Sequence, residues 1–172
     1  MDFKENGEQL DKKTFLVSES SINSFDKGEL LIPDTSVIVK WFFKDNEKNK
    51  EKADIILGRY MDNKIKIIAP ELAVFELANV LKNKLGKYKS EQLEIIDKLY
   101  NMGIIFYIDM EILKRAVEIA IDIKESVYDG IFLATAEYFN GKFITDDNKL
   151  FLNYSNYKKK KIKIITLDDY SC

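Results

Sequence analysis

Hydrophobic and polar residues alternate in a regular way from residue 30 onward. Short continuous apolar runs are typical of strands buried on both faces of a sheet. Between these runs, apolar residues recur every three or four positions, as in amphipathic helices. We predict strands at 30–32, 65–68, 104–107, 143–145 and 162–166, and helices at 37–42, 53–60, 70–85, 90–100, 109–123 and 129–139. Strands that alternate with helices predict an α/β fold, a three-layer α/β/α arrangement around a five-stranded parallel sheet.

The first 29 residues lack this pattern. They are polar apart from a short apolar run at 15–17. We interpret residues 1–29 as an N-terminal extension, either partly ordered or an arm that packs on the domain or on a partner chain. Residues 30–172 are then one domain, a length that suits a single hydrophobic core.

Composition narrows the possible chemistry. The 172 residues include no histidine, and the single cysteine is the last residue. This excludes histidine bases, Ser-His-Asp triads and thiolate zinc sites. The formal net charge of −2 argues against a protein that coats nucleic acid without specificity.

We expect a cytoplasmic protein without membrane association. No apolar run approaches the ~20 residues that span a bilayer. The segment that starts at Met1 also lacks the apolar core of a secretory signal.

Four acidic residues lie in or beside segments that should form the core. Asp34 and Asp147 follow predicted strands, Asp129 opens a predicted helix, and Glu76 lies within another. Because the carboxyl ends of parallel strands share one edge of a sheet, we expect these side chains to converge. Two like charges ~4 Å apart repel by ~4 kcal/mol at an effective dielectric constant near 20, so protons or a cation must neutralise the cluster. Oxygen ligands favour Mg²⁺ or Mn²⁺, which suits metal-dependent phosphodiester hydrolysis.

The segments around these acids resemble the motifs of one family. They are Pro33–Val37, the helix Glu71–Leu81, Tyr128–Glu137 and Ile144–Asp147. In this order and spacing, the chain resembles PIN-domain ribonucleases from about residue 30 to 167, and most closely the VapC-type toxins of type II toxin–antitoxin pairs. The resemblance implies a PIN-like, Rossmann-like fold.

The resemblance also implies roles for individual residues. Asp34, Glu76, Asp129 and Asp147 would be the catalytic acids, with Asp34, Asp129 and Asp147 holding Mg²⁺ or Mn²⁺. The family pattern of Thr, any residue, then Asp selects Asp147 over Asp146. The supporting residues would be Ser36, Thr145 and Asp146.

The function implied is a Mg²⁺-dependent endoribonuclease acting on tRNA or rRNA, homodimeric and silenced by a small antitoxin. Two alternatives remain open: a nuclease that matures rRNA or tRNA, and a PIN-like module that has lost catalysis and binds RNA or protein. A response-regulator receiver with Asp109 as phosphoacceptor is disfavoured, because acids follow the fourth strand where a lysine is needed.

A lysine run precedes the fifth predicted strand. Lys158, Lys159, Lys160 and Lys161 form either a solvated loop or a contact with the RNA backbone.

Overall fold

The computed structural model describes residues 28–43, 48–85 and 89–171. The predicted N-terminal extension therefore lies almost wholly outside the described residues. The chain forms strands and helices in alternation, and their bounds are β1 (Glu29–Pro33), α2 (Thr35–Lys40), α3 (Lys50–Met61), β2 (Ile65–Ile67), β3 (Ala69–Pro70), α4 (Leu72–Leu85), α5 (Lys89–Asn101), β4 (Ile105–Phe106), α6 (Met110–Ile123), α7 (Val127–Tyr138), β5 (Lys142–Thr145), α8 (Asn148–Ser155) and β6 (Ile164–Thr166).

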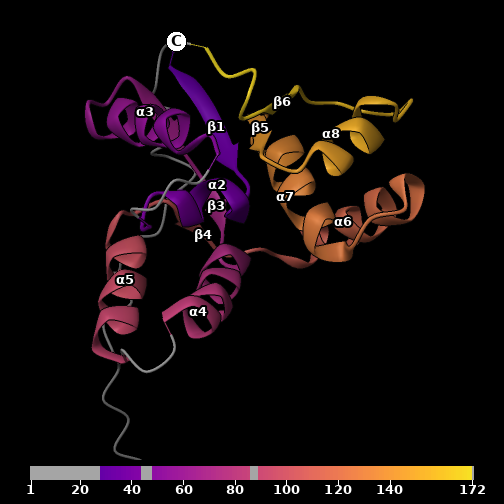
Figure 1. Cartoon of the computed structure of the whole chain (residues 1–172). Helices are drawn as coiled ribbons and strands as arrows, with labels where there is room; N and C mark the ends of the chain where they lie inside the picture. The colour runs from indigo at the N-terminus through magenta and orange to yellow at the C-terminus, as the bar shows by residue number, and fades with distance from the viewer. Residues whose placement is uncertain (1–27, 44–47, 86–88, 172) are drawn as a thin grey trace, which may run out of the picture.

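The main sheet is parallel and has the strand order β2-β1-β5-β6. In the central strand, Leu31 is in register with Ile67 on one side and Lys142 on the other. Leu31 and Ile32 are fully buried, as expected of a strand covered on both faces. Figure 1 shows α3 on one side of β1, with α6, α7 and α8 on the other. The predicted three-layer α/β fold is confirmed.

The prediction of one five-stranded sheet needs correction. The segment predicted at 104–107 forms β4, but β4 pairs with β3 in a separate two-stranded parallel sheet. The chain changes sheets between adjacent residues: the Ile68 amide donates to the Leu31 carbonyl at 3.1 Å, and the Ala69 amide donates to the Ile104 carbonyl at 2.8 Å. Residues 65–70 therefore contribute one strand to each sheet. The helix predicted from residue 70 begins at Leu72.

The predicted start of α6 and the predicted end of α7 are confirmed. The Asp109 side chain accepts a hydrogen bond from the Ile112 amide at 2.9 Å and caps α6. After α7, Asn140 adopts φ 50°. The Gly141 amide then donates to the Ala136 carbonyl at 2.9 Å, which closes the helix in a Schellman motif.

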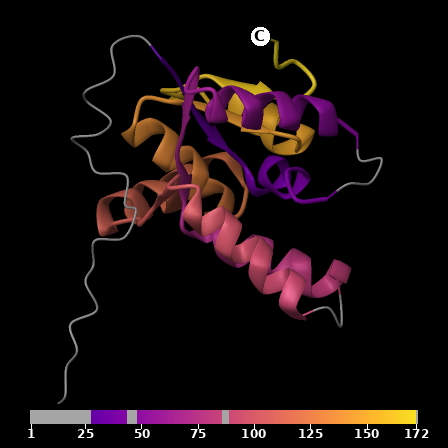
Figure 2. The same cartoon turned by 90° about the vertical axis from the view of Figure 1, so that its left-hand side faces the viewer.

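Helices α4 and α5 form an antiparallel pair that projects from the sheet (Figures 1 and 2). The first turn of α4 stays at the sheet, because the Glu71 amide donates to the Phe106 carbonyl of β4 at 2.8 Å. Within the described ranges, no helix is long and apolar enough to cross a membrane.

The α6 and α7 helices pack closely at Gly130. A Cβ at this position would lie 2.3 Å from the Ala116 carbonyl oxygen of α6. Only glycine therefore lets the first turn of α7 approach the backbone of α6.

We predict that Gly130→Ala lowers the free energy of unfolding by about 1–3 kcal/mol, because the added methyl group meets backbone that cannot move alone. Gly58→Ala in α3 is the matched control. Its Cβ would meet no atom within 4 Å, so this change should raise stability by up to ~1 kcal/mol. Urea unfolding measures both changes, and equal effects would contradict the packing argument.

Candidate active site

Asp34 is the centre of the acidic group. It directly follows β1, and its amide donates to the Ile144 carbonyl of β5 at 2.8 Å. Its Oδ2 accepts hydrogen bonds from the hydroxyls of Ser36 at 2.9 Å and Thr145 at 2.7 Å. The carboxylate is therefore fixed at the carboxyl edge of the two central strands by one hydroxyl from α2 and one from β5.

Burial shifts the protonation of Asp34. Loss of hydration raises its pKa above the ordinary value, and the hydrogen bonds from Thr145 and Ser36 oppose that rise. The negative charge of Asp129 raises the pKa further. Asp34 and Asp129, which are far apart in the sequence, thus act on each other.

Glu76 joins the same group from α4. It lies about one turn into the helix, and its Oε2 accepts a hydrogen bond from the Thr35 hydroxyl. Burial raises the pKa of Glu76, and the charges of Asp34 and Asp129 add to the shift. The structure therefore brings Asp34, Glu76 and Asp129 into mutual electrostatic contact.

Asp129 also caps its own helix. Its Oδ2 accepts hydrogen bonds from the Ser126 hydroxyl at 2.6 Å and the Ser126 amide at 3.2 Å. The Asp129 amide donates back to the Ser126 hydroxyl at 3.1 Å, which completes a capping box. This reciprocal pair holds the carboxylate in the first turn of α7.

Asp147 is linked to Asp34 through one hydroxyl. The Asp147 amide donates to the Thr145 hydroxyl at 3.0 Å, and that hydroxyl donates to Asp34. Asp147 Oδ1 accepts hydrogen bonds from the amides of Lys149 and Leu150, at 2.8 and 3.0 Å, and so caps α8. Helix α8 was missed in the sequence, because it is short and buries only Leu150 and Tyr154.

Asp146 points to a different set of partners. Its carboxylate lies 3.2 Å from the Lys40 ammonium and accepts a hydrogen bond from the Asn49 side chain at 2.7 Å. The Asp146 amide donates to the Ser36 hydroxyl at 3.2 Å. Asp146 thus holds the loop after β5 in place through its ion pair with Lys40, whose side chain is only 8% exposed.

Lys149 is a cation at the rim of the site that the sequence did not reveal. Its ammonium lies 2.8 Å from Glu125, the residue before Ser126. The hydrogen bond to Glu125 raises the pKa of Lys149, and the charges of Asp147 and Asp129 contribute. No pattern predicted this lysine, because its placement depends on α8.

The lysine run is placed away from the acids. Lys159 lies 3.1 Å from Asp122 at the end of α6, and Lys161 lies 3.7 Å from Glu137 near the end of α7. Glu137 is eight residues beyond Asp129, or about 12 Å along a helix axis. No contact between Lys158–Lys161 and the four acids is seen among the described residues, so RNA binding by this run stays a prediction.

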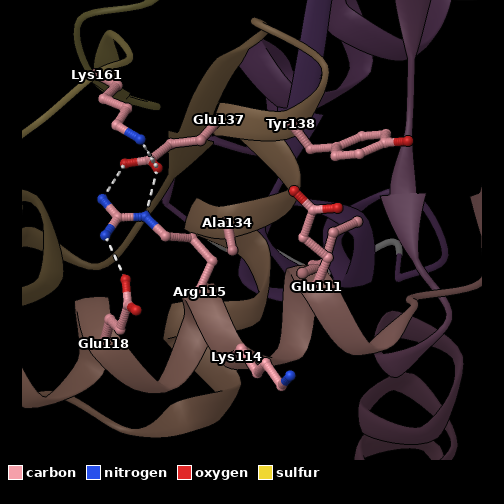
Figure 3. A pocket seen from close by; sticks show the side chains of 9 residues that line it. Glu111, Lys114, Arg115, Glu118, Ala134, Glu137, Tyr138 and Lys161 are labelled. Carbon is pink, nitrogen blue, oxygen red and sulfur yellow. Dashed lines mark hydrogen bonds and ion pairs between the residues drawn. The ribbon is translucent and has the colours of Figure 1, made fainter.

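A pocket of about 360 Å³ lies between α6 and the end of α7, apart from the acids. Figure 3 shows Arg115 at its wall, paired with Glu137 and Glu118. The Arg115 guanidinium makes two hydrogen bonds to Glu137, at 2.7 and 3.1 Å. Because the Arg115 guanidinium is already paired with Glu137 and Glu118, we assign the pocket a structural role.

The chemistry of the acids fits a hard divalent cation. The hydrogen bonds above use Oδ2 of Asp34, Oδ2 of Asp129 and Oδ1 of Asp147, and the second oxygen of each carboxylate takes no part in them. Such bonds orient a carboxylate that binds a metal through its other oxygen. In the described part of the chain, however, no three acids are gathered closely enough to form a finished ligand set.

The parallel sheet and the acids at its carboxyl edge define an α/β protein with a carboxylate site. The model of the PIN domain family matches residues 31–156. The chain belongs to the PIN domain family, and the resemblance seen in its motifs is confirmed.

Solved structures share this fold. FitAcB from Neisseria gonorrhoeae has a TM-score of 0.60 at 16% identity and covers 81% of this chain and 99% of its own. DNA-bound VapBC from Salmonella typhimurium has a TM-score of 0.60 at 12% identity and covers 82% of this chain and 99% of its own. A toxin–antitoxin complex from Klebsiella pneumoniae has a TM-score of 0.58 at 20% identity and covers 83% of this chain and 99% of its own. At these identities the likeness is one of fold, and no curated protein sequence matches the chain.

The raised pKa values of Asp34 and Glu76 predict a stability that falls with rising pH when no cation is bound. Below the ordinary values of 3.8 and 4.5, both groups are neutral in the folded and unfolded chain. Above them the unfolded chain releases its protons first, so folding weakens until the raised folded-state pKa values are passed.

Asp34→Asn removes one of these groups. We expect the variant to gain stability relative to the parent as the pH rises above about 4. Urea unfolding in EDTA at several pH values measures the difference. If the difference in free energy of unfolding between parent and variant does not change with pH, the raised pKa of Asp34 is contradicted.

Proposed function

We propose that the protein is a Mg²⁺-dependent endoribonuclease. The observation that carries this proposal is the acidic group itself: burial and the charge of Asp129 raise the pKa values of both Asp34 and Glu76, and the Asp147 amide is tied to Asp34 through Thr145. Four acids drawn from separate segments cost stability unless a cation compensates their repulsion. Oxygen-only donors suit Mg²⁺ or Mn²⁺.

Each part of the site has a role in hydrolysis. Asp34, Asp129 and Asp147 would hold the ion through their carboxylate oxygens, and Ser36 and Thr145 would keep the Asp34 carboxylate oriented. The ion, when bound, would supply activated water and stabilise charge on the phosphoryl group. Glu76, whose pKa is raised, is suited to accept a proton from the attacking water. The Lys149 ammonium would face a phosphate at the rim.

We further propose that the nuclease is the toxin of a toxin–antitoxin pair. The supporting observation is the fold shared with the Klebsiella toxin–antitoxin complex and with VapBC of Salmonella. A small antitoxin and a homodimer are the partners that this role requires, and tRNA or rRNA is the substrate. A short neighbouring gene for a binding partner would separate this role from RNA maturation.

Cleavage of total tRNA and rRNA tests the proposed activity. We expect cleavage with Mg²⁺ or Mn²⁺, none with EDTA, and a loss of at least about 100-fold in Asp129→Asn, since a weakened ligand and a lost charge remove transition-state stabilisation. Asparagine keeps a side-chain acceptor for the capping box, so folding should change little.

The inactive-module alternative makes the opposite prediction. It predicts no cleavage by the parent under any of these conditions and no rise in melting temperature when Mg²⁺ is added. Cleavage that persists in both EDTA and Asp129→Asn would exclude the proposed site.

Lys149→Gln tests the cation at the rim. Loss of one phosphate contact should weaken RNA binding at low salt and reduce the slope of log affinity against log salt concentration by about one. Replacing Lys158–Lys161 by glutamine tests the second predicted contact in the same assay. An unchanged slope for Lys149→Gln would remove this lysine from the RNA surface.

A further inference from the structure

A nearly buried carboxylate lies in the turn between α6 and α7. The Glu125 side chain is only 10% exposed, although its neighbours in the turn, Lys124 and Ser126, are both exposed. Lys124 ends α6 in the left-handed conformation, with φ 59°, and the chain reverses there. A carboxylate loses hydration when it is buried, so partners must compensate it. The contacts of Glu125 therefore explain its position.

Helix α8 supplies two of these partners. The Lys149 ammonium lies 2.8 Å from the Glu125 carboxylate. Asn153, four residues further along α8, donates a hydrogen bond from its side-chain amide to the same carboxylate. Residues four apart lie on one face of a helix. One face of α8 thus binds Glu125 through a cation and an amide.

The same lysine lies close to two acids of the site. Its backbone amide donates to Asp147 Oδ1 at 2.8 Å, so the side chain of Lys149 starts beside a site carboxylate. The hydrogen bond to Glu125 makes the largest contribution to the raised pKa of Lys149. The charges of Asp147 and Asp129 raise this pKa as well. Because the lysine stem is long and flexible, the ammonium has two acidic destinations: Glu125 and the acids of the site.

An ammonium among the site acids would compete with a divalent cation. It would relieve part of the carboxylate repulsion that otherwise favours binding of Mg²⁺. It would also take up oxygen atoms that a hard cation needs as ligands. A metal site beside a flexible lysine therefore requires another group that holds the lysine away.

We propose that Glu125 is a positioning residue that holds the Lys149 ammonium outside the acidic group and so keeps Asp129 and Asp147 available to a divalent cation. This inference rests on the proposed nuclease function. Glu125 acts on the ion only through Lys149. The same ion pair keeps Lys149 at the rim, where it would meet a phosphate.

The alternative is a purely structural role, in which Glu125 fastens the turn before α7 to α8. The two roles differ in what they predict for Lys149. If the ion pair only fastens the turn, loss of Lys149 releases Asp129 and weakens Mg²⁺ binding. If Glu125 holds a competitor away, loss of Lys149 removes the competitor and does not weaken Mg²⁺ binding.

The test titrates Mg²⁺ against the melting temperature without RNA, which measures cation binding directly. The Mg²⁺ concentration for half-maximal cleavage of total tRNA is measured beside it. Glu125→Gln keeps an acceptor for Asn153 but removes the charge that holds Lys149. It should raise both Mg²⁺ midpoints about 3- to 10-fold, as expected for competition by an ion pair open to solvent.

The second variant decides between the two roles. Lys149→Gln should have a melting-temperature midpoint for Mg²⁺ at or below that of the parent. The double variant Glu125→Gln/Lys149→Gln should return to the value of Lys149→Gln, a non-additive result expected of two groups in contact. A midpoint of Lys149→Gln above the parent's would overturn the inference, whether or not Glu125→Gln folds.

A matched control breaks an ion pair away from the site. Glu94 and Lys98 lie 2.7 Å apart on α5, and Glu94→Gln should change neither Mg²⁺ midpoint. Urea unfolding in EDTA shows whether each variant folds.

The outcomes separate this inference from the function on which it rests. A parent that cleaves RNA, with equal Mg²⁺ midpoints in parent and Glu125→Gln, overturns the role of Glu125 and leaves the nuclease intact. A raised midpoint that persists in the double variant assigns Glu125 a structural role and also overturns the inference. A parent that Mg²⁺ stabilises but that cleaves nothing refutes the nuclease, and the order of the variants still decides the role of Glu125. A parent that responds to neither Mg²⁺ nor Mn²⁺ refutes the metal site and both proposals with it.

Discussion

The repulsion between the half-buried carboxylates of Asp34, Glu76 and Asp129 is the constraint on which this molecule depends. Asp34 cannot lose its proton easily, because burial and the charge of Asp129 both oppose ionisation. Two hydroxyls and a capping box nevertheless hold the acids in fixed orientations, each using one oxygen of a carboxylate. The fold thus maintains a site that is unfavourable by itself and that the proposed cation would make favourable.

The architecture explains how distant segments maintain that arrangement. The central strands β1 and β5 deliver Asp34 and Thr145 to one edge, because parallel neighbours end on the same side. Gly130 lets α7 lie close to α6, and the capping box then fixes Asp129 in the first turn. The ion pair between the buried Lys40 and the half-buried Asp146 keeps an ammonium next to the site without placing it among the other acids.

Much of the fold was predictable from sequence, because strands and helix ends follow from local sequence patterns. Apolar runs located the strands, and Asp109 and Asn140 marked helix ends through the conformations that they favour. The change of sheet at Ile68 was not predictable, since it depends on which carbonyl each amide meets. The positions of Lys149 and Thr35 beside the acids were not predictable for a similar reason. A lysine or threonine carries no signal until tertiary packing sets a carboxylate beside it.

The bond from Thr145 to Asp34 joins residues that are 111 positions apart in the sequence. Loop closure over such a span is slow compared with local helix formation. A ribosome adds about 5–20 residues per second, so the segments that hold Asp34 and Glu76 leave it seconds before Thr145 and Asp147 are made. The nascent chain therefore cannot assemble its acidic group until the 111 residues that follow Asp34 have been made. A chain that stops before Thr145 therefore lacks both the hydroxyl that holds Asp34 and the Asp147 carboxylate.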